Sequence, residues 1–159
     1  MTVPELLMPQ YEHKQTSPLH VVLYAIGTIL VGAAWLSREN RVVSLILVSS
    51  AALMILAALC FGYLVVRDEG DALVLRYGPL PVFRRHIPFA RIAAAEPSRS
   101  AVIDGWGIHY IPGRGTTYNL WGFDCVKMKV DNRIVRVGSD DVQRLARFLT
   151  EKMAGQGAF

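Results

Sequence analysis

The longest run of the chain without a charged side chain extends from Val42 to Val66. At about 1.5 Å of rise per residue, a helix of this length exceeds the roughly 30 Å of a bilayer's hydrocarbon core. A second apolar run, from Leu19 to Leu36, precedes it and is near the shortest length that can span. Only residues 37–41 separate the two runs. The pattern therefore predicts an antiparallel hairpin of two transmembrane helices, 19–36 and 42–66.

After Arg67 the apolar residues alternate with polar ones over short segments, which is the pattern of half-buried β-strands. Such segments are predicted at 72–77, 82–88, 92–96, 106–111, 116–120, 125–130 and 133–137. Turn signals separate them, among them Gly78-Pro79-Leu80-Pro81 and Asp131-Asn132. From Val142 to Met153 the apolar residues fall at helical spacing. This predicts six or seven antiparallel strands closed by one C-terminal amphipathic helix.

The chain thus divides into an N-terminal segment 1–18, a transmembrane hairpin 19–66, a domain 67–154 and a tail 155–159. The first segment is polar and interrupted by prolines, so no long helix is expected there. Because the strands and the closing helix all follow Gly70, the part from Gly70 to Met153 is expected to fold without its anchor.

Basic residues predict the orientation of the hairpin, which places both chain ends on one side of the membrane. The connecting loop carries two bases, whereas the flanks on the other side carry five. These five are Lys14, Arg67, Arg76, Arg84 and Arg85. The positive-inside rule then places both termini in the cytoplasm.

The overall charge excludes some classes of partner. The chain has 17 basic and 13 acidic residues, a net charge of +4, and its bases are interspersed among acids. We therefore expect no nucleic-acid partner. The two cysteines, Cys60 and Cys125, fall in the hairpin and in the polar domain, so a disulfide between them is not expected. No charge lies within either span, which argues against an ion pathway through this chain alone.

The order of motifs resembles that of bacterial pleckstrin-homology-like (PH-like) domains that follow one or two transmembrane helices. The matching pieces are residues 75–80, Ile87-Pro88 with Ile92, residues 105–110, Tyr118-Asn119, Trp121-Gly122 and residues 135–141. The resemblance covers roughly residues 64–153. It implies an α+β membrane protein of the bacterial inner (plasma) membrane. In it, a transmembrane helical hairpin precedes a PH-like antiparallel split β-barrel capped by a C-terminal helix. The resemblance also implies a platform for binding and assembly.

Candidate catalytic and metal-binding residues lack the spacing that such chemistry needs. His86, His109 and Cys125 are too far apart in sequence to resemble a metal site. Ser98, Ser100 and Asp104 are near His109 only in sequence, which does not make a nucleophile–base pair. We therefore predict no catalytic residue, no metal, no cofactor and no small-molecule substrate.

Four aromatic residues, Trp106, Tyr110, Tyr118 and Trp121, form a cluster along the predicted strands. Because each ring buries a large area, such a cluster is more typical of a core than of a ligand pocket. We expect these rings to pack inside the domain.

One segment suggests a binding site. Gly78 to Phe83 is apolar and is followed directly by two arginines. Leu80 and Phe83 are candidates to contact lipid or a partner, and Arg84 and Arg85 are candidates to meet lipid phosphates. The alternative is that Val82 and Phe83 begin a strand and pack inward.

Two classes of function follow. The first is a non-enzymatic, membrane-anchored module for binding or scaffolding, acting at the cytoplasmic surface through the bilayer, other membrane subunits or self-association. The alternative is an accessory subunit of a larger membrane complex of the transporter or secretion type, packed through its hairpin.

Overall fold

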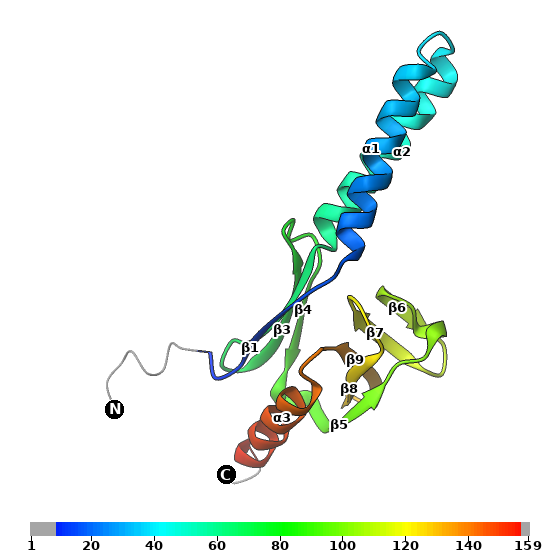
Figure 1. Ribbon diagram of the computed structural model, residues 1–159. Helices are drawn as coiled ribbons and strands as arrows, with labels where there is room; N and C mark the ends of the chain where they lie inside the picture. The colour runs from blue at the N-terminus through cyan, green and yellow to red at the C-terminus, as the bar shows by residue number, and fades with distance from the viewer. Residues whose placement is uncertain (1–8, 157–159) are drawn as a thin grey trace.

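The computed structural model describes residues 9–156, which form two long N-terminal helices, two β-sheets and a C-terminal helix (Figure 1). The first eight residues of the predicted segment 1–18 and the last three of the tail 155–159 lie outside the described residues. The helices are α1 (Leu19–Leu36), α2 (Arg41–Cys60) and α3 (Val142–Gln156). The strands are β1 (Glu12–Thr16), β2 (Tyr63–Asp68), β3 (Ala72–Gly78), β4 (Arg84–Pro88), β5 (Ile92–Arg99), β6 (Gly107–Ile111), β7 (Gly115–Asn119), β8 (Asp124–Val130) and β9 (Arg133–Gly138). Two 3-10 turns are η2 (Phe89–Arg91) and η3 (Val102–Asp104).

Helices α1 and α2 pack against each other as a hairpin that projects from the sheets (Figure 1). Their contact is made by small buried residues, Gly27 and Ala34 on α1 and Ala51 and Ala58 on α2. These residues are one heptad apart in each helix, which keeps them on a single face and lets the backbones approach closely. Both helices are long and apolar enough to cross a membrane.

The second helix ends at Cys60 and not at Val66, so the predicted span 42–66 was too long. Residues after Gly62 form strand β2, in which Leu64 and Val66 are buried and Tyr63 and Val65 are half-buried. A buried strand and a buried helix both lack charge, and absence of charge alone does not separate them.

Strand β1 was not predicted, and it joins the hairpin to the domain. It pairs antiparallel with β2, with Glu12 opposite Arg67 and Thr16 opposite Tyr63. The first sheet, sheet A, has the order β1-β2-β3-β4. The helical hairpin is therefore an insertion between two neighbouring strands of one sheet (Figure 1).

The second sheet, sheet B, has the order β5-β8-β9-β7-β6. The strands run antiparallel except that β7 and β9 are parallel, so the predicted all-antiparallel split barrel is corrected to two sheets that do not close. The β8–β9 turn has Asp131 and Asn132 at φ 46° and 63°, as a two-residue hairpin requires. The turn places β9 next to β8, so that β9 lies between β8 and β7 in sheet B. A Cβ at Gly115 would collide with the Ile134 carbonyl, so glycine permits this approach of β7 to β9.

The predicted C-terminal helix is confirmed, and it covers the core between the sheets. Leu145 and Leu149 of α3 are fully buried. The Phe148 ring stacks on Tyr11, just before β1, with centroids 5.2 Å apart, and meets Phe89 edge-on at 5.9 Å. Residues on both sides of the hairpin insertion thus belong to one core.

The hairpin insertion yields a first prediction. Replacing residues 17–62 by Asn-Gly joins the cross-strand partners Thr16 and Tyr63 through a two-residue turn. We expect the resulting chain to be water-soluble and to unfold cooperatively, because both sheets and α3 are retained. Circular dichroism during thermal unfolding measures this.

The fragment from Gly70 to Met153 is the matched comparison. It lacks β1 and β2, and with them the buried side chains of Tyr11, Leu64 and Val66. We therefore expect this fragment not to fold, which reverses the expectation drawn from the sequence. Cooperative melting of the fragment at the temperature of the joined chain would show that β1 and β2 lie outside the folding unit.

Candidate functional site

Three loops gather where α1 begins and α2 ends, and we call them the hairpin-proximal loops. They are the β3–β4 loop (79–83), the β5–β6 connection (100–106) and the β7–β8 loop (120–123). Each touches the base of the hairpin or the strand that leads into it. The Leu80 amide donates to the Leu59 carbonyl at 2.9 Å, and the Gln15 side-chain amide donates to the Trp121 carbonyl at 3.2 Å. Trp106 lines a cavity of about 100 Å³ together with Leu19 of α1.

The β3–β4 loop contains the predicted candidates Leu80 and Phe83. Phe83 stacks on Phe61 with centroids 5.4 Å apart, and Phe61 meets Tyr77 edge-on at 5.4 Å. Leu80, Val82 and Phe83 nevertheless remain 40%, 59% and 38% exposed. Strand β4 begins only at Arg84, so Val82 and Phe83 do not start a strand that packs inward.

The two candidate arginines lie on opposite faces of β4, because successive side chains of a strand alternate. Arg84 donates to the Glu69 carboxylate at 2.8 Å, so its charge already has a partner within the domain. Arg85 is opposite the fully buried Leu75 and two positions before the buried Ile87, which places it on the core-facing side of the edge strand. Among residues 9–156, Arg85 has no acidic partner within ion-pair distance.

Arg85 stands at a cleft between the edge of sheet A and sheet B, which we call the split cleft. The cleft has a volume of about 250 Å³ and is lined by Tyr77, Val82, Phe83, Arg84, Arg85, Ile108 and Tyr118. It is smaller than the roughly 300–1,000 Å³ of typical ligand pockets, so it suits a small anionic group beside an apolar one. The charged side chains that line it are both cationic.

Tyr77 holds the two sheets together behind this cleft. Its hydroxyl lies 3.3 Å from the Asn119 carbonyl and 3.4 Å from the Gly107 carbonyl, to which it donates. Burial raises the pKa of Tyr77 far above its ordinary value, so the hydroxyl remains a neutral donor at any physiological pH. The arginines thus dominate the electrostatics of the split cleft.

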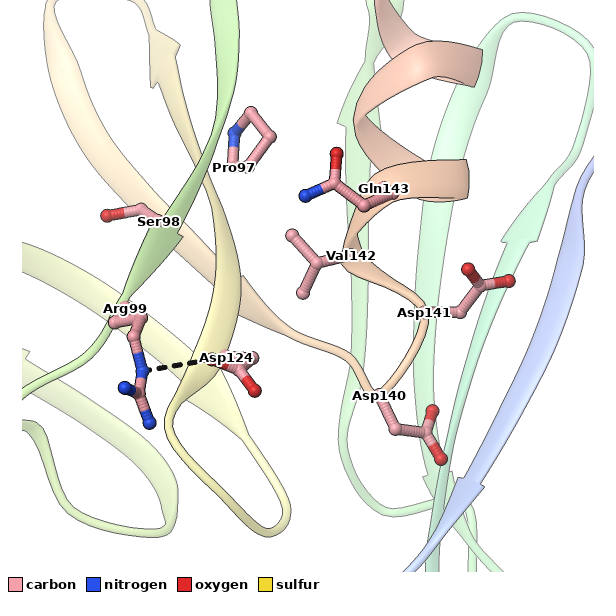
Figure 2. A pocket seen from close by; sticks show the side chains of 8 residues that line it. All are labelled: Pro97, Ser98, Arg99, Asp124, Asp140, Asp141, Val142 and Gln143. Atoms are coloured by element: carbon pink, nitrogen blue, oxygen red, sulfur yellow. Dashed lines mark ion pairs between the residues drawn. The ribbon is translucent and has the colours of Figure 1, made fainter.

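A larger groove lies between β5 and the start of α3 (Figure 2). It has a volume of about 530 Å³, and each of its charged residues has an ion-pair partner in the fold. Arg99 pairs with Asp124 at 3.0 Å, and Asp140 contacts His13 of β1. In Figure 2, Asp140 and Asp141 point away from Arg99. The groove therefore offers no set of free polar groups that converge on one point.

Cys125, considered for metal binding, and Ser100, considered for catalysis, are held within the fold by burial or hydrogen bonding. Cys125 is fully buried, and burial raises the pKa of its thiol. The Ser100 hydroxyl donates to the Phe123 carbonyl at 3.0 Å. No group of three potential metal ligands occurs in the part of the chain that the structure describes.

Three of the four residues of the predicted aromatic cluster are not core residues, and only Tyr118 packs against the core. Trp106 and Trp121 stack with centroids 4.4 Å apart but remain 41% and 37% exposed. Tyr110 is 72% exposed, whereas Tyr118 lines the split cleft. The tryptophans lie in loops beside the strand ends and not on an inward face, which alternation along the sequence did not show.

A buried carboxylate fixes the β5–β6 connection, and sequence reasoning missed it. The fully buried Asp104 accepts two hydrogen bonds from the Arg114 guanidinium, at 3.0 and 2.8 Å, and one from the Ala101 amide at 2.6 Å. Hydrogen bonding from Arg114 is the main cause that lowers the pKa of the Asp104 carboxyl. The Asp104–Arg114 ion pair joins the connection before β6 to the turn after it.

Two sheets with a helix over their core, attached to an apolar helical hairpin, define an α+β domain with its cleft at the hairpin base. The family model of the bacterial PH domain matches residues 19–152. The chain therefore belongs to the bacterial PH domain family, as its motifs predicted. A comparison with curated proteins finds no match.

The Asp104–Arg114 pair generates a prediction about pH. A depressed pKa means that Asp104 contributes stability fully above its ordinary pKa of about 3.9 and loses that contribution as pH falls toward the folded-state value. We expect Asp104→Asn to lower the melting temperature at pH 7, and the gap from the unmodified protein to narrow at the acid end. Asp124→Asn, which removes an exposed ion pair, is the control and should change little. A gap that stays constant down to the acid limit would contradict this role of the carboxylate.

Proposed function

We propose that this protein is a non-enzymatic binding module held at the cytoplasmic face of the bacterial inner membrane, where it binds the anionic headgroups of the bilayer that its hairpin crosses. The observation that carries the proposal is Arg85. It is a cation without an acidic partner among the described residues, and it lines the split cleft, where apolar side chains lie beside it.

The hairpin supports the membrane part of this proposal. Its outward side chains are apolar, with Ile29 and Leu45 69% and 70% exposed, and such side chains are stable in lipid but costly in water. The five basic residues on β1 to β4 that flank the hairpin outnumber the two in the loop at 37–41, which favours termini in the cytoplasm. The cytoplasmic leaflet is the anionic one.

A weak intrinsic contact is sufficient in this arrangement. Each arginine near an anionic surface contributes about 1 kcal/mol. The hairpin keeps the split cleft beside the headgroups, so the local lipid concentration is high and the entropy cost of encounter is already met. Leu80 and Phe83 supply apolar contact beside Arg85.

The absence of catalysis is part of the proposal. The serine and aspartate considered as reactive groups have structural partners, Ser100 with a backbone carbonyl and Asp104 with Arg114. A nucleophile adjacent to a base is the arrangement that covalent catalysis needs. The groups that line the split cleft suit recognition of charge and apolar surface instead.

A second candidate function is that of an accessory subunit in a larger membrane complex, packed through the hairpin. One observation favours it. Gly32 lies on the outward side of α1, where an added Cβ would meet nothing within 4 Å, and Thr28 is exposed on the same helix. Small outward residues allow another helix to approach closely.

The lipid proposal predicts different results for the two arginines. In native mass spectrometry of the full chain from mild detergent, we expect phosphatidylglycerol to be retained in preference to phosphatidylcholine. Arg85→Ala should reduce that preference about fivefold, the equivalent of about 1 kcal/mol. Arg84→Ala is the matched control and should have a small effect, because Glu69 already neutralises that guanidinium.

Added salt should weaken the retention of anionic lipid, since the contact is electrostatic and partly exposed. Equal losses in the two arginine variants, or no preference for anionic lipid in the unmodified chain, would contradict the proposal. Co-purification of a stoichiometric membrane protein that Gly32→Leu abolishes would instead favour the accessory-subunit function.

A further inference from the structure

Sheet B presents an exposed apolar surface that the split cleft does not include. Val102 and Ile103 of η3 are 82% and 68% exposed, and Phe123 in the β7–β8 loop is 36% exposed. Together with the half-exposed Trp106 and Trp121 they occupy two of the three hairpin-proximal loops. We call these five residues the apolar shelf.

The shelf is a fixed part of the fold, because hydrogen bonds and stacking join its two loops. The Ser100 amide donates to the Phe123 carbonyl at 2.6 Å, which ties the β5–β6 connection to the β7–β8 loop. The stacked rings of Trp106 and Trp121 make a second link. Asp104, the last residue of η3, is fully buried and is held by Arg114 and the Ala101 amide. Because Asp104 anchors η3 to the domain, Val102 and Ile103 in the same turn are held at the surface.

The shelf is continuous with the base of the hairpin. Trp106 shares a cavity with Leu19 and Leu23, which belong to the first turns of α1. Trp121 accepts a hydrogen bond from Gln15 of β1, just before α1 begins. In Figure 1, the β6 and β7 ends that carry these loops lie on the side of sheet B nearest the hairpin.

The composition of the shelf identifies what covers it. It combines two tryptophans, whose amphipathic rings are enriched where membrane and water meet, with aliphatic and phenyl side chains and no charged side chain. Five large exposed apolar residues in two loops that are joined by a hydrogen bond and a ring stack indicate a contact surface, since soluble proteins usually expose such residues singly. A bilayer crossed by α1 would begin beside Leu19, next to Trp106.

We propose that the apolar shelf inserts into the boundary between headgroups and acyl chains of the bilayer that α1 and α2 cross. Both sheets then rest on the membrane, sheet A through the β3–β4 loop and sheet B through the shelf. This inference rests on the proposed membrane anchoring but not on recognition of anionic lipid. It fixes the tilt of the domain and directs the split cleft toward the headgroups.

The test uses the full chain in nanodiscs of phosphatidylcholine alone, with the two buried cysteines replaced by alanine. A spin label is attached at Ile103→Cys, and its accessibility to oxygen and to a water-soluble nickel chelate is measured by electron paramagnetic resonance. Arg147→Cys, on the exposed side of α3, is the matched control. We expect the ratio of oxygen to nickel accessibility to be at least several-fold higher at position 103 than at 147.

Two outcomes would overturn the inference. High nickel accessibility at position 103, equal to that at 147, would place the shelf in water. Low accessibility to both reagents would place it against protein, either a second copy of this chain or another subunit.

A second measurement avoids the label. Trp35 is replaced by phenylalanine so that Trp106 and Trp121 are the remaining tryptophans, and quenching by lipids brominated near the headgroup is recorded. Val102→Asp with Ile103→Asp should reduce the quenching at least twofold, whereas Tyr110→Asp, an exposed aromatic outside the shelf, should not. Unchanged quenching in the double variant would overturn insertion. Because the lipid is neutral, failure here is separate from failure of the Arg85 experiment.

Discussion

The pairing of β1 with β2 across the base of the helical hairpin is the interaction on which the rest of the structure depends. The register runs from Glu12 opposite Arg67 to Thr16 opposite Tyr63, so the chain leaves sheet A into α1 and returns from α2 into the adjacent strand. A domain attached through two paired strands is held in a defined orientation, whereas one flexible linker would leave it free to rotate. The hairpin-proximal loops owe their position to this connection.

Because the pairing of β1 with β2 fixes the orientation of the domain, the alternation of side chains along the edge strand β4 matters for function. Arg84 and Arg85 are neighbours in sequence and both line the split cleft, but only Arg84 pairs with Glu69. Of these two arginines, Arg85 is the one without an acidic partner among the described residues. Val82 and Phe83 of the β3–β4 loop line the split cleft beside this cation. Charge and apolar contact are therefore combined on the surface that faces the proposed bilayer.

Much of this fold follows from local sequence patterns. The parts that do not follow from them depend on contacts between residues that are distant in sequence. Uncharged length predicted two helices, alternation predicted most strands, and Asp131-Asn132 predicted a hairpin turn that the structure contains. Strand β1 was not predicted because it is a polar edge strand in which only Gln15 is buried. Strand β2 was not predicted because it continues the uncharged run of α2. The parallel pairing of β7 with β9 and the exposure of Trp106 and Trp121 depend on which strand ends meet, for which the sequence has no periodic signal. The sequence proposed Leu80, Phe83, Arg84 and Arg85 as a candidate site, which stays a prediction, and it did not indicate that only Arg84 has an acidic partner.

Hydrogen exchange of the full chain in nanodiscs tests the central claim most directly, namely that β1 and β2 bind the domain to its hairpin as one cooperative unit. The amides of β1 that pair with β2 should exchange as slowly as those of β3, because opening them requires unfolding of the whole sheet. Fast exchange throughout residues 12–16 beside slow exchange in β3 would contradict the account. In that case β1 would be a frayed end, and the domain would hang from the membrane by a single strand.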